Sequence, residues 1–133
     1  MVATANVLNL AQQGRHFYDG QDPYSQTEFE RKVSWLGERI KVLNADVLAV
    51  QEVWDEVALR AAIARSGLQY SAVSVPGAEN GPRQHGAQGT PRVGIVTRLK
   101  VESIASLVDF PAAAVVDVPG LGPHTRFERP PLL

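Results

Sequence analysis

The clearest pattern in the chain is a set of apolar residues separated by alternating steps of four and three. These residues are Phe29, Val33, Leu36, Ile40 and Leu43. The spacing predicts an amphipathic helix of about four turns, because residues three and four apart share one helical face. Ser25 followed by Glu28 fits a capping box, in which each side chain satisfies a backbone donor at the start of the helix.

Shorter apolar runs surround this helix. Val2–Leu10 alternates apolar with small or polar residues and predicts a strand, which enters a loop over 11–26. Val47–Val50 follows the helix and suits a short buried strand. A second helix is predicted over Asp55–Ser66 and should end at Gly67.

The second half of the chain predicts mainly strands. A strand over Tyr70–Val75 precedes an exposed Gly- and Pro-rich loop over 76–91. Beyond it we expect a tight hairpin of Arg92–Leu99 with Val101–Phe110, then short strands over Ala112–Val118 and Thr125–Leu133. This order indicates one mixed α/β or α+β layered domain over residues 1–133. Because the chain ends in apolar Pro130–Leu133, we expect the domain to be truncated within a strand.

Composition narrows the classes of partner. The net charge is -1, from 13 basic and 14 acidic residues, so no strongly basic field is present to hold nucleic acid by counterion release. A phosphodiester substrate would then need a bound cation. The chain has no cysteine, which excludes disulfides and cysteine-based zinc sites. We see no signal peptide and no membrane span, so the default expectation is a cytoplasmic protein.

Two polar residues stand where apolar strands end, Asn6 and Glu52. A carboxylate at the end of a buried strand is costly unless it is paired or binds a cation. Hard divalent cations such as Mg²⁺ take oxygen ligands, usually one or two carboxylates with waters and substrate phosphate. The alternative is structural: Glu52 caps the next turn or pairs with an arginine, and Asn6 is a turn residue. Spacing alone favours that alternative.

The sequence motifs around Asn6 and Glu52 favour the metal site over the structural alternative. "ATANVLNL" and "ERIKVLNADVLAVQEVWD" resemble the first two signature regions of the endonuclease/exonuclease/phosphatase superfamily, the deoxyribonuclease-like metal-dependent phosphodiesterases. Asn6 matches the metal-site Asn of that family and Glu52 its metal-binding Glu, with Gln51 and Asp46 matching neighbours. "RVGIVTRLKVES" and "TRFERPPLL" resemble two later strand motifs, and the second places Arg129 as a candidate phosphate ligand.

The resemblance implies the N-terminal half of a four-layer α/β/β/α sandwich with two packed mixed β-sheets. It also implies a hydrolase that cuts phosphodiester bonds with Mg²⁺ or Mn²⁺ held by Glu52 and Asn6. A nuclease is the expected outcome, with nucleic acid as substrate. A lipid or inositol phosphate phosphodiesterase of the same superfamily, or a non-catalytic fragment or binding module, are the alternatives.

The family's later His, its Asp-Asn pair and its final Asp-His pair are not found in these 133 residues. We therefore expect the chain alone to be inactive, since a metal-bound carboxylate makes no nucleophile without a general base. Other candidates have simpler interpretations. His16 and His85 lie in Gly-rich loops and should be solvent-exposed, and Trp35 and Trp54 should serve packing rather than base stacking. The charged positions of the first helix, Lys32 among them, should form a solvated face.

Overall fold

The computed structural model describes residues 1–16, 18, 20–75, 90–105, 107, 109–111, 114–120 and 122–126. These residues form a small mixed α/β fold with two helices and two sheets. The elements, in chain order, are β1 (Val2–Leu10), α1 (Gln26–Leu43), β2 (Val47–Val53), α2 (Glu56–Ser66), β3 (Ala72–Ser74), β4 (Arg92–Thr97), β5 (Val116–Val118) and β6 (Gly122–His124). Within the described ranges, no helix is long and apolar enough to span a membrane.

The larger sheet has four strands in the order β1-β2-β4-β3. β1 and β2 are parallel, and α1 makes the connection between them, as parallel pairing requires a crossover. β4 is antiparallel to both β2 and β3. Strands distant in sequence are therefore neighbours, and the carboxyl ends of β1 and β2 meet at one edge of the sheet.

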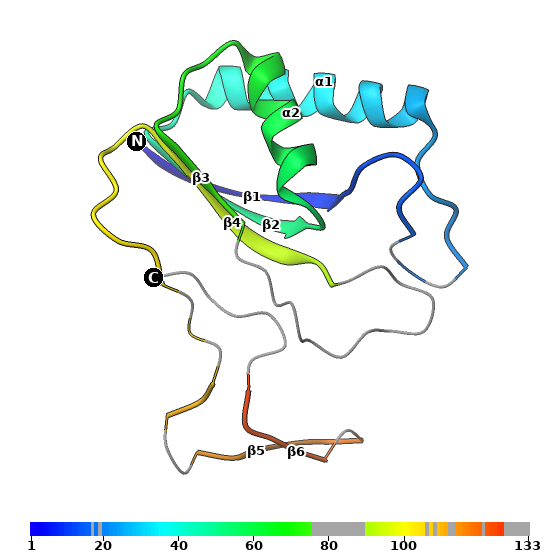
Figure 1. Ribbon diagram of the computed structural model, residues 1–133, viewed down its shortest axis with the longest axis vertical. Coiled ribbons are helices and arrows are strands. Elements are labelled where there is room, and N and C mark those ends of the chain that lie inside the picture. Colours follow the sequence, from blue (N-terminus) through cyan, green and yellow to red (C-terminus); the bar gives the residue numbers. More distant parts are fainter. Residues whose placement is uncertain are drawn as a thin grey trace.

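Both helices cover the same face of this sheet (Figure 1). The core lies between the helices and this face of the sheet, where Leu48 and Val50 of β2 and Val96 of β4 are each about 1 % exposed or less. From α1, Val33 and Ile40 reach the same core. The register pairs Leu48 with Val96, so the buried residues of adjacent strands point to one face.

The helices approach each other closely at Gly37. A Cβ added there would lie 2.6 Å from the Cβ of Arg65 and 2.9 Å from the backbone oxygen of Ala62. Only glycine leaves room for the α2 backbone at this distance. The helix ends also agree with their sequences, because Asn44 and Gly67 both have left-handed backbone at the C-terminal caps.

The predicted helices and the strands over Val2–Leu10, Tyr70–Val75 and Arg92–Leu99 have counterparts in the structure, but the predicted strand pairing does not. The capping box of Ser25 and Glu28 is present, and α1 covers the predicted periodic stretch, although Leu43 is 37 % exposed. The predicted hairpin of Arg92–Leu99 with Val101–Phe110 is wrong. β4 instead pairs with β2 and β3, and residues 101–105 form no strand.

Of the strand predicted over Ala112–Val118 the structure describes residues 114–118, and 116–118 form β5, which pairs with β6 in a separate two-stranded sheet. Figure 1 shows this hairpin away from the helices, beyond the other face of the larger sheet. The predicted strand over Thr125–Leu133 falls mostly outside the described residues, as do Arg129, His85 and most of the loop over 76–91. His16 is exposed, as expected.

Candidate functional site

The candidate site lies where the paired ends of β1 and β2 lose their regular register. Asn6 faces Gln51, and the next pair is Leu10 with Val53. Val7, Leu8 and Asn9 therefore lie opposite a single residue of β2, Glu52. Irregularities of this kind re-aim side chains that a regular strand would direct to alternate faces.

Three residues at this irregularity have left-handed backbone without being glycine. The φ angles are 49° at Leu8, 55° at Asn9 and 63° at Glu52. Asparagine tolerates this region, whereas leucine and glutamate pay roughly 1–2 kcal/mol each for it. Such strain persists only where surrounding contacts impose it, and it concentrates at functional sites.

The contacts that hold Glu52 come from β1. The side-chain amide of Asn6 donates from Nδ2 to Oε1 of Glu52 at 2.8 Å. The backbone N–H of Asn9 donates to Oε2 at 3.2 Å. Each carboxylate oxygen thus accepts one hydrogen bond and keeps lone-pair capacity for a further partner.

The orientation of the Asn6 amide is fixed from both sides. Its Oδ1 accepts a hydrogen bond from the backbone N–H of Leu8 at 2.8 Å. A flipped amide would point its oxygen at the Glu52 carboxylate and its NH₂ at the Leu8 N–H, so both contacts would become repulsive. Asn6 consequently presents a donor to Glu52 and an acceptor to its own loop.

Trp54 contacts the same site through Asn9. Its ring is 1 % exposed, and its Nε1–H donates to Oδ1 of Asn9 at 3.1 Å. Its backbone N–H donates to the Leu10 oxygen at 2.8 Å, and Tyr18 packs edge-on against the ring with centroids 5.3 Å apart. Trp54 therefore serves packing, as the sequence predicted, and also fixes a residue that contacts Glu52. Trp35 is 63 % exposed, so it is not a core residue, and the Arg39 guanidinium lies 5.8 Å from the centre of its ring.

Asp55 attaches the long β1–α1 loop to the second helix. It is the N-cap of α2, where its Oδ1 accepts from the Ala58 N–H at 2.7 Å. Its Oδ2 accepts from the backbone N–H of Gln12 at 2.9 Å and lies 3.4 Å from the Arg15 guanidinium. A single buried carboxylate thus stabilises both the helix start and the loop that follows β1.

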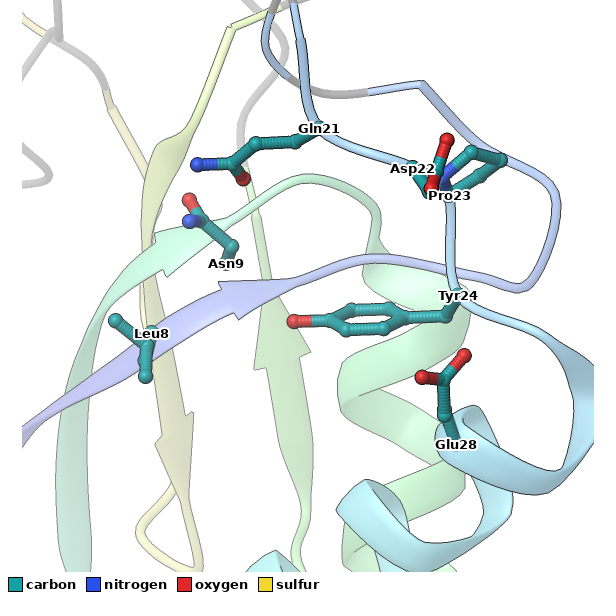
Figure 2. A pocket seen from close by; sticks show the side chains of 7 residues that line it. All are labelled: Leu8, Asn9, Gln21, Asp22, Pro23, Tyr24 and Glu28. Atoms are coloured by element: carbon teal, nitrogen blue, oxygen red, sulfur yellow. The ribbon is translucent and has the colours of Figure 1, made fainter.

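A pocket opens beside the site, between the end of β1 and the start of α1 (Figure 2). Its volume is about 400 Å³. It is lined by Leu8, Asn9, Gln21, Asp22, Pro23, Tyr24 and Glu28. The Glu28 carboxylate has a lowered pKa, first because the Ser25 hydroxyl donates to it and second because the Ser25 backbone N–H does.

Lys32 is not part of a purely solvated helix face. Its ammonium donates to the backbone oxygen of Leu8 and lies 3.1 Å from the Tyr24 hydroxyl. It also lies 5.1 Å from the centre of the Tyr24 ring. The sequence prediction for this residue is wrong, because the alternation of charges along α1 does not show that the strand end passes within reach.

The two residues predicted to hold a metal are thus in direct contact. Glu52 pairs with no arginine among its described contacts; both of its partners are N–H groups of β1. The alternative that Asn6 is a turn residue holds for its amide oxygen, because the hydrogen bond from the Leu8 N–H is the pattern of an Asx turn. Gln51 instead donates to the Thr4 hydroxyl at 2.7 Å.

The donor set agrees in kind with a hard divalent cation. One carboxylate suits Mg²⁺, which keeps several waters and needs no full protein cage, whereas the Asn6 amide presents its NH₂ to Glu52 and its oxygen to the Leu8 N–H. Across the described part of the chain, no group of three His, Cys, Asp or Glu side chains comes together. A zinc site of several protein ligands therefore has no counterpart among those residues.

Comparisons with protein-family models, with curated proteins and with solved structures find no match to this chain.

Proposed function

We propose that this chain holds the metal-binding part of a Mg²⁺- or Mn²⁺-dependent phosphodiesterase, with nucleic acid as the substrate. The observation that carries the proposal is the contact between Asn6 and Glu52. Asn6 forms the last regular pair of β1 with β2 before the register breaks, and Glu52 lies opposite that break near the end of β2, in strained backbone and with lone pairs left for a ligand. A structural ion pair would not need that strain.

In this proposal Glu52 supplies the principal metal ligand. The Asn6 amide directs its NH₂ toward Glu52, so its oxygen would join the cation as a second ligand only after the amide turns. The cation would neutralise charge on a phosphoryl oxygen, which is the contribution such ions make to phosphoester cleavage. Asn6 and the Asn9 N–H orient the Glu52 carboxylate, as outer partners of metal ligands commonly do. Arg129, which the resemblance assigns to phosphate, lies outside the described residues.

We also propose that the larger sheet belongs to a four-layer sandwich with a second sheet on its open face. Support comes from the residues that point away from the helices. Ala49 of β2 pairs with Ile95 of β4 on that face, and both are partly exposed; Val2 of β1 is 76 % exposed. Apolar side chains on the uncovered face of a sheet favour a further layer.

Binding of Mn²⁺ is the direct test, because its paramagnetism broadens the NMR signals of nearby amides. We expect broadening centred on Asn9 and Val53 in the 133-residue chain, and competition by Mg²⁺. Glu52→Gln should weaken Mn²⁺ binding at least about ten-fold, because it removes the charged ligand. Glu38→Gln, on the exposed face of α1, is the matched control and should leave the affinity unchanged.

Broadening spread over the surface carboxylates, unaffected by Glu52→Gln, would overturn the proposal. For hydrolysis we expect background rates from the chain alone with a nitrophenyl phosphodiester and Mg²⁺. The general base that the resemblance calls for is not among its 133 residues. Turnover that Glu52→Gln abolishes would show instead that the chain contains its own base.

A further inference from the structure

The pocket beside Glu52 has a chemistry of its own. Its volume of about 400 Å³ falls within the range of roughly 300–1,000 Å³ typical of small-molecule sites. It touches the candidate metal site through Asn9, whose backbone N–H donates to Glu52 while its side chain lines the pocket (Figure 2). A molecule bound at Glu52 would therefore have its neighbouring group at the pocket.

Two amide side chains give the pocket its polar edge. The Oδ1 of Asn9 is occupied by the Trp54 N–H, so its NH₂ is the group left to donate. Gln21 is exposed on the loop, and Figure 2 shows its amide extending toward that of Asn9. Side-chain amides offer a donor and an acceptor together, which is the pattern that nucleobase edges present.

The remaining walls are flat or apolar. Leu8, Pro23 and Tyr24 line the pocket, and Lys32 fixes the Tyr24 ring through its contacts to the hydroxyl and the ring face. Leu8 is 69 % exposed and has a φ of 49°. An exposed leucine in left-handed backbone is unfavourable on both counts, which indicates that its side chain has a role at this surface.

Charge distinguishes among possible occupants. Asp22 and Glu28 both line the pocket, and Glu28 remains ionised because Ser25 donates to it from its backbone N–H at 2.8 Å and its hydroxyl at 2.7 Å. The two carboxylates repel a phosphate. Both Ser25 hydrogen bonds end on one Glu28 oxygen, Oε2, so the carboxylate stays charged, and a neutral polar ring that contacts the two amides avoids the repulsion that a phosphate would meet.

We infer that this pocket receives a nucleobase, from the nucleotide next to the phosphate that Glu52 and its metal would hold. The inference rests on the proposed function for the placement of that phosphate. The base would lie against Tyr24 and Leu8, with its edge toward Asn9 and Gln21. Stacking on an aromatic ring together with amide contacts is a common way to bind unpaired bases.

The test separates the base from the phosphate. The isotope-labelled 133-residue chain is titrated with adenosine, guanosine, cytidine and uridine, without metal, while backbone amide signals are followed by NMR. We expect at least one nucleoside to shift the signals of Asn9 and Gln21 saturably, and ribose 5-phosphate to leave them in place. Gln21→Ala should weaken that binding about five-fold, the effect of one hydrogen bond. Gln13→Ala, in the same loop but outside the pocket, should not change it.

A second variant tests whether the Leu8 side chain contributes to nucleoside binding. Leu8→Gly removes the exposed side chain while relieving the backbone, so it should fold normally and still bind nucleoside more weakly. The nucleoside titration contains no metal, which separates this inference from the proposed function: loss of Mn²⁺ binding alone would not affect it. The inference is overturned if no nucleoside shifts these signals, if ribose 5-phosphate shifts them equally, or if Gln21→Ala binds as the unmodified chain does.

Discussion

The indole N–H of Trp54 donates to Oδ1 of Asn9 at 3.1 Å, and the backbone N–H of the same asparagine donates to Glu52 at 3.2 Å. A buried ring is thus connected to the candidate metal ligand through one residue. Trp54 is 1 % exposed, so its position is set by the core. The geometry of Glu52 depends on packing as well as on its own strand.

Removing that N–H should weaken the candidate site before it unfolds the chain. Trp54→Phe keeps an aromatic ring but leaves Asn9 without its donor. We expect a fall in Mn²⁺ affinity smaller than the roughly ten-fold loss that follows removal of a direct partner of a metal ligand, because Trp54 acts on Glu52 through Asn9. Trp35→Phe, on exposed α1 surface, is the matched control. Equal affinities for the two variants would mean that Asn9 is positioned without Trp54.

The backbone at Glu52 makes an unusual prediction about glycine. Because its φ is 63°, glycine should be tolerated there better than alanine by about 1 kcal/mol in the free energy of unfolding. The same pair of substitutions at Glu38, within α1, should give the reverse order by about 1 kcal/mol. Urea unfolding of the four variants measures both differences. If alanine were preferred at both positions, the left-handed conformation of Glu52 would be wrong.

Local sequence explains the elements that depend on local chemistry. The periodic apolar residues of α1 and its Ser25–Glu28 cap specify a helix within one stretch of chain, and the structure confirms them. The pairing of β4 with β2 and β3 depends instead on strands distant in sequence. The sequence pattern of a strand does not determine which other strand it pairs with, which is why the hairpin prediction was wrong.

The candidate site was predictable only in part, because some of its features depend on local sequence and others on contacts between distant strands. Glu52 could be recognised as a polar residue near a strand end, and parallel pairing brings Asn6 beside it, although β1 continues past Asn6 to Leu10. The left-handed backbone of Glu52 could not, because glutamate has no intrinsic preference for it and tertiary contacts impose it. Lys32 was misread since its acceptor, the Leu8 oxygen, belongs to a distant strand.

Close contact between the helices predicts that Gly37→Ala is harmful despite its better helix propensity. The new Cβ would lie 2.6 Å from the Arg65 Cβ and 2.9 Å from the Ala62 oxygen, so the helices must separate. We expect a net loss of about 1–3 kcal/mol in the free energy of unfolding, typical of overpacking. Glu38→Ala, one residue along and exposed, should not destabilise. A more stable Gly37→Ala chain would contradict this packing.

Acid should weaken the start of α1 through Glu28, whose pKa lies below its ordinary value of 4.5. The Ser25 hydroxyl is the main cause and the Ser25 backbone N–H the second. Because the folded pKa is lower than the unfolded one, the stabilisation is fully present above the unfolded value and is lost as the pH falls through the folded value. Glu28→Gln should therefore lower the melting temperature near neutral pH and reduce its fall in acid. Glu38→Gln removes the same charge from α1 without the Ser25 contacts, so the acid limb should keep its slope. If both variants lose the same slope, general charge on α1 rather than the capping box sets the acid response.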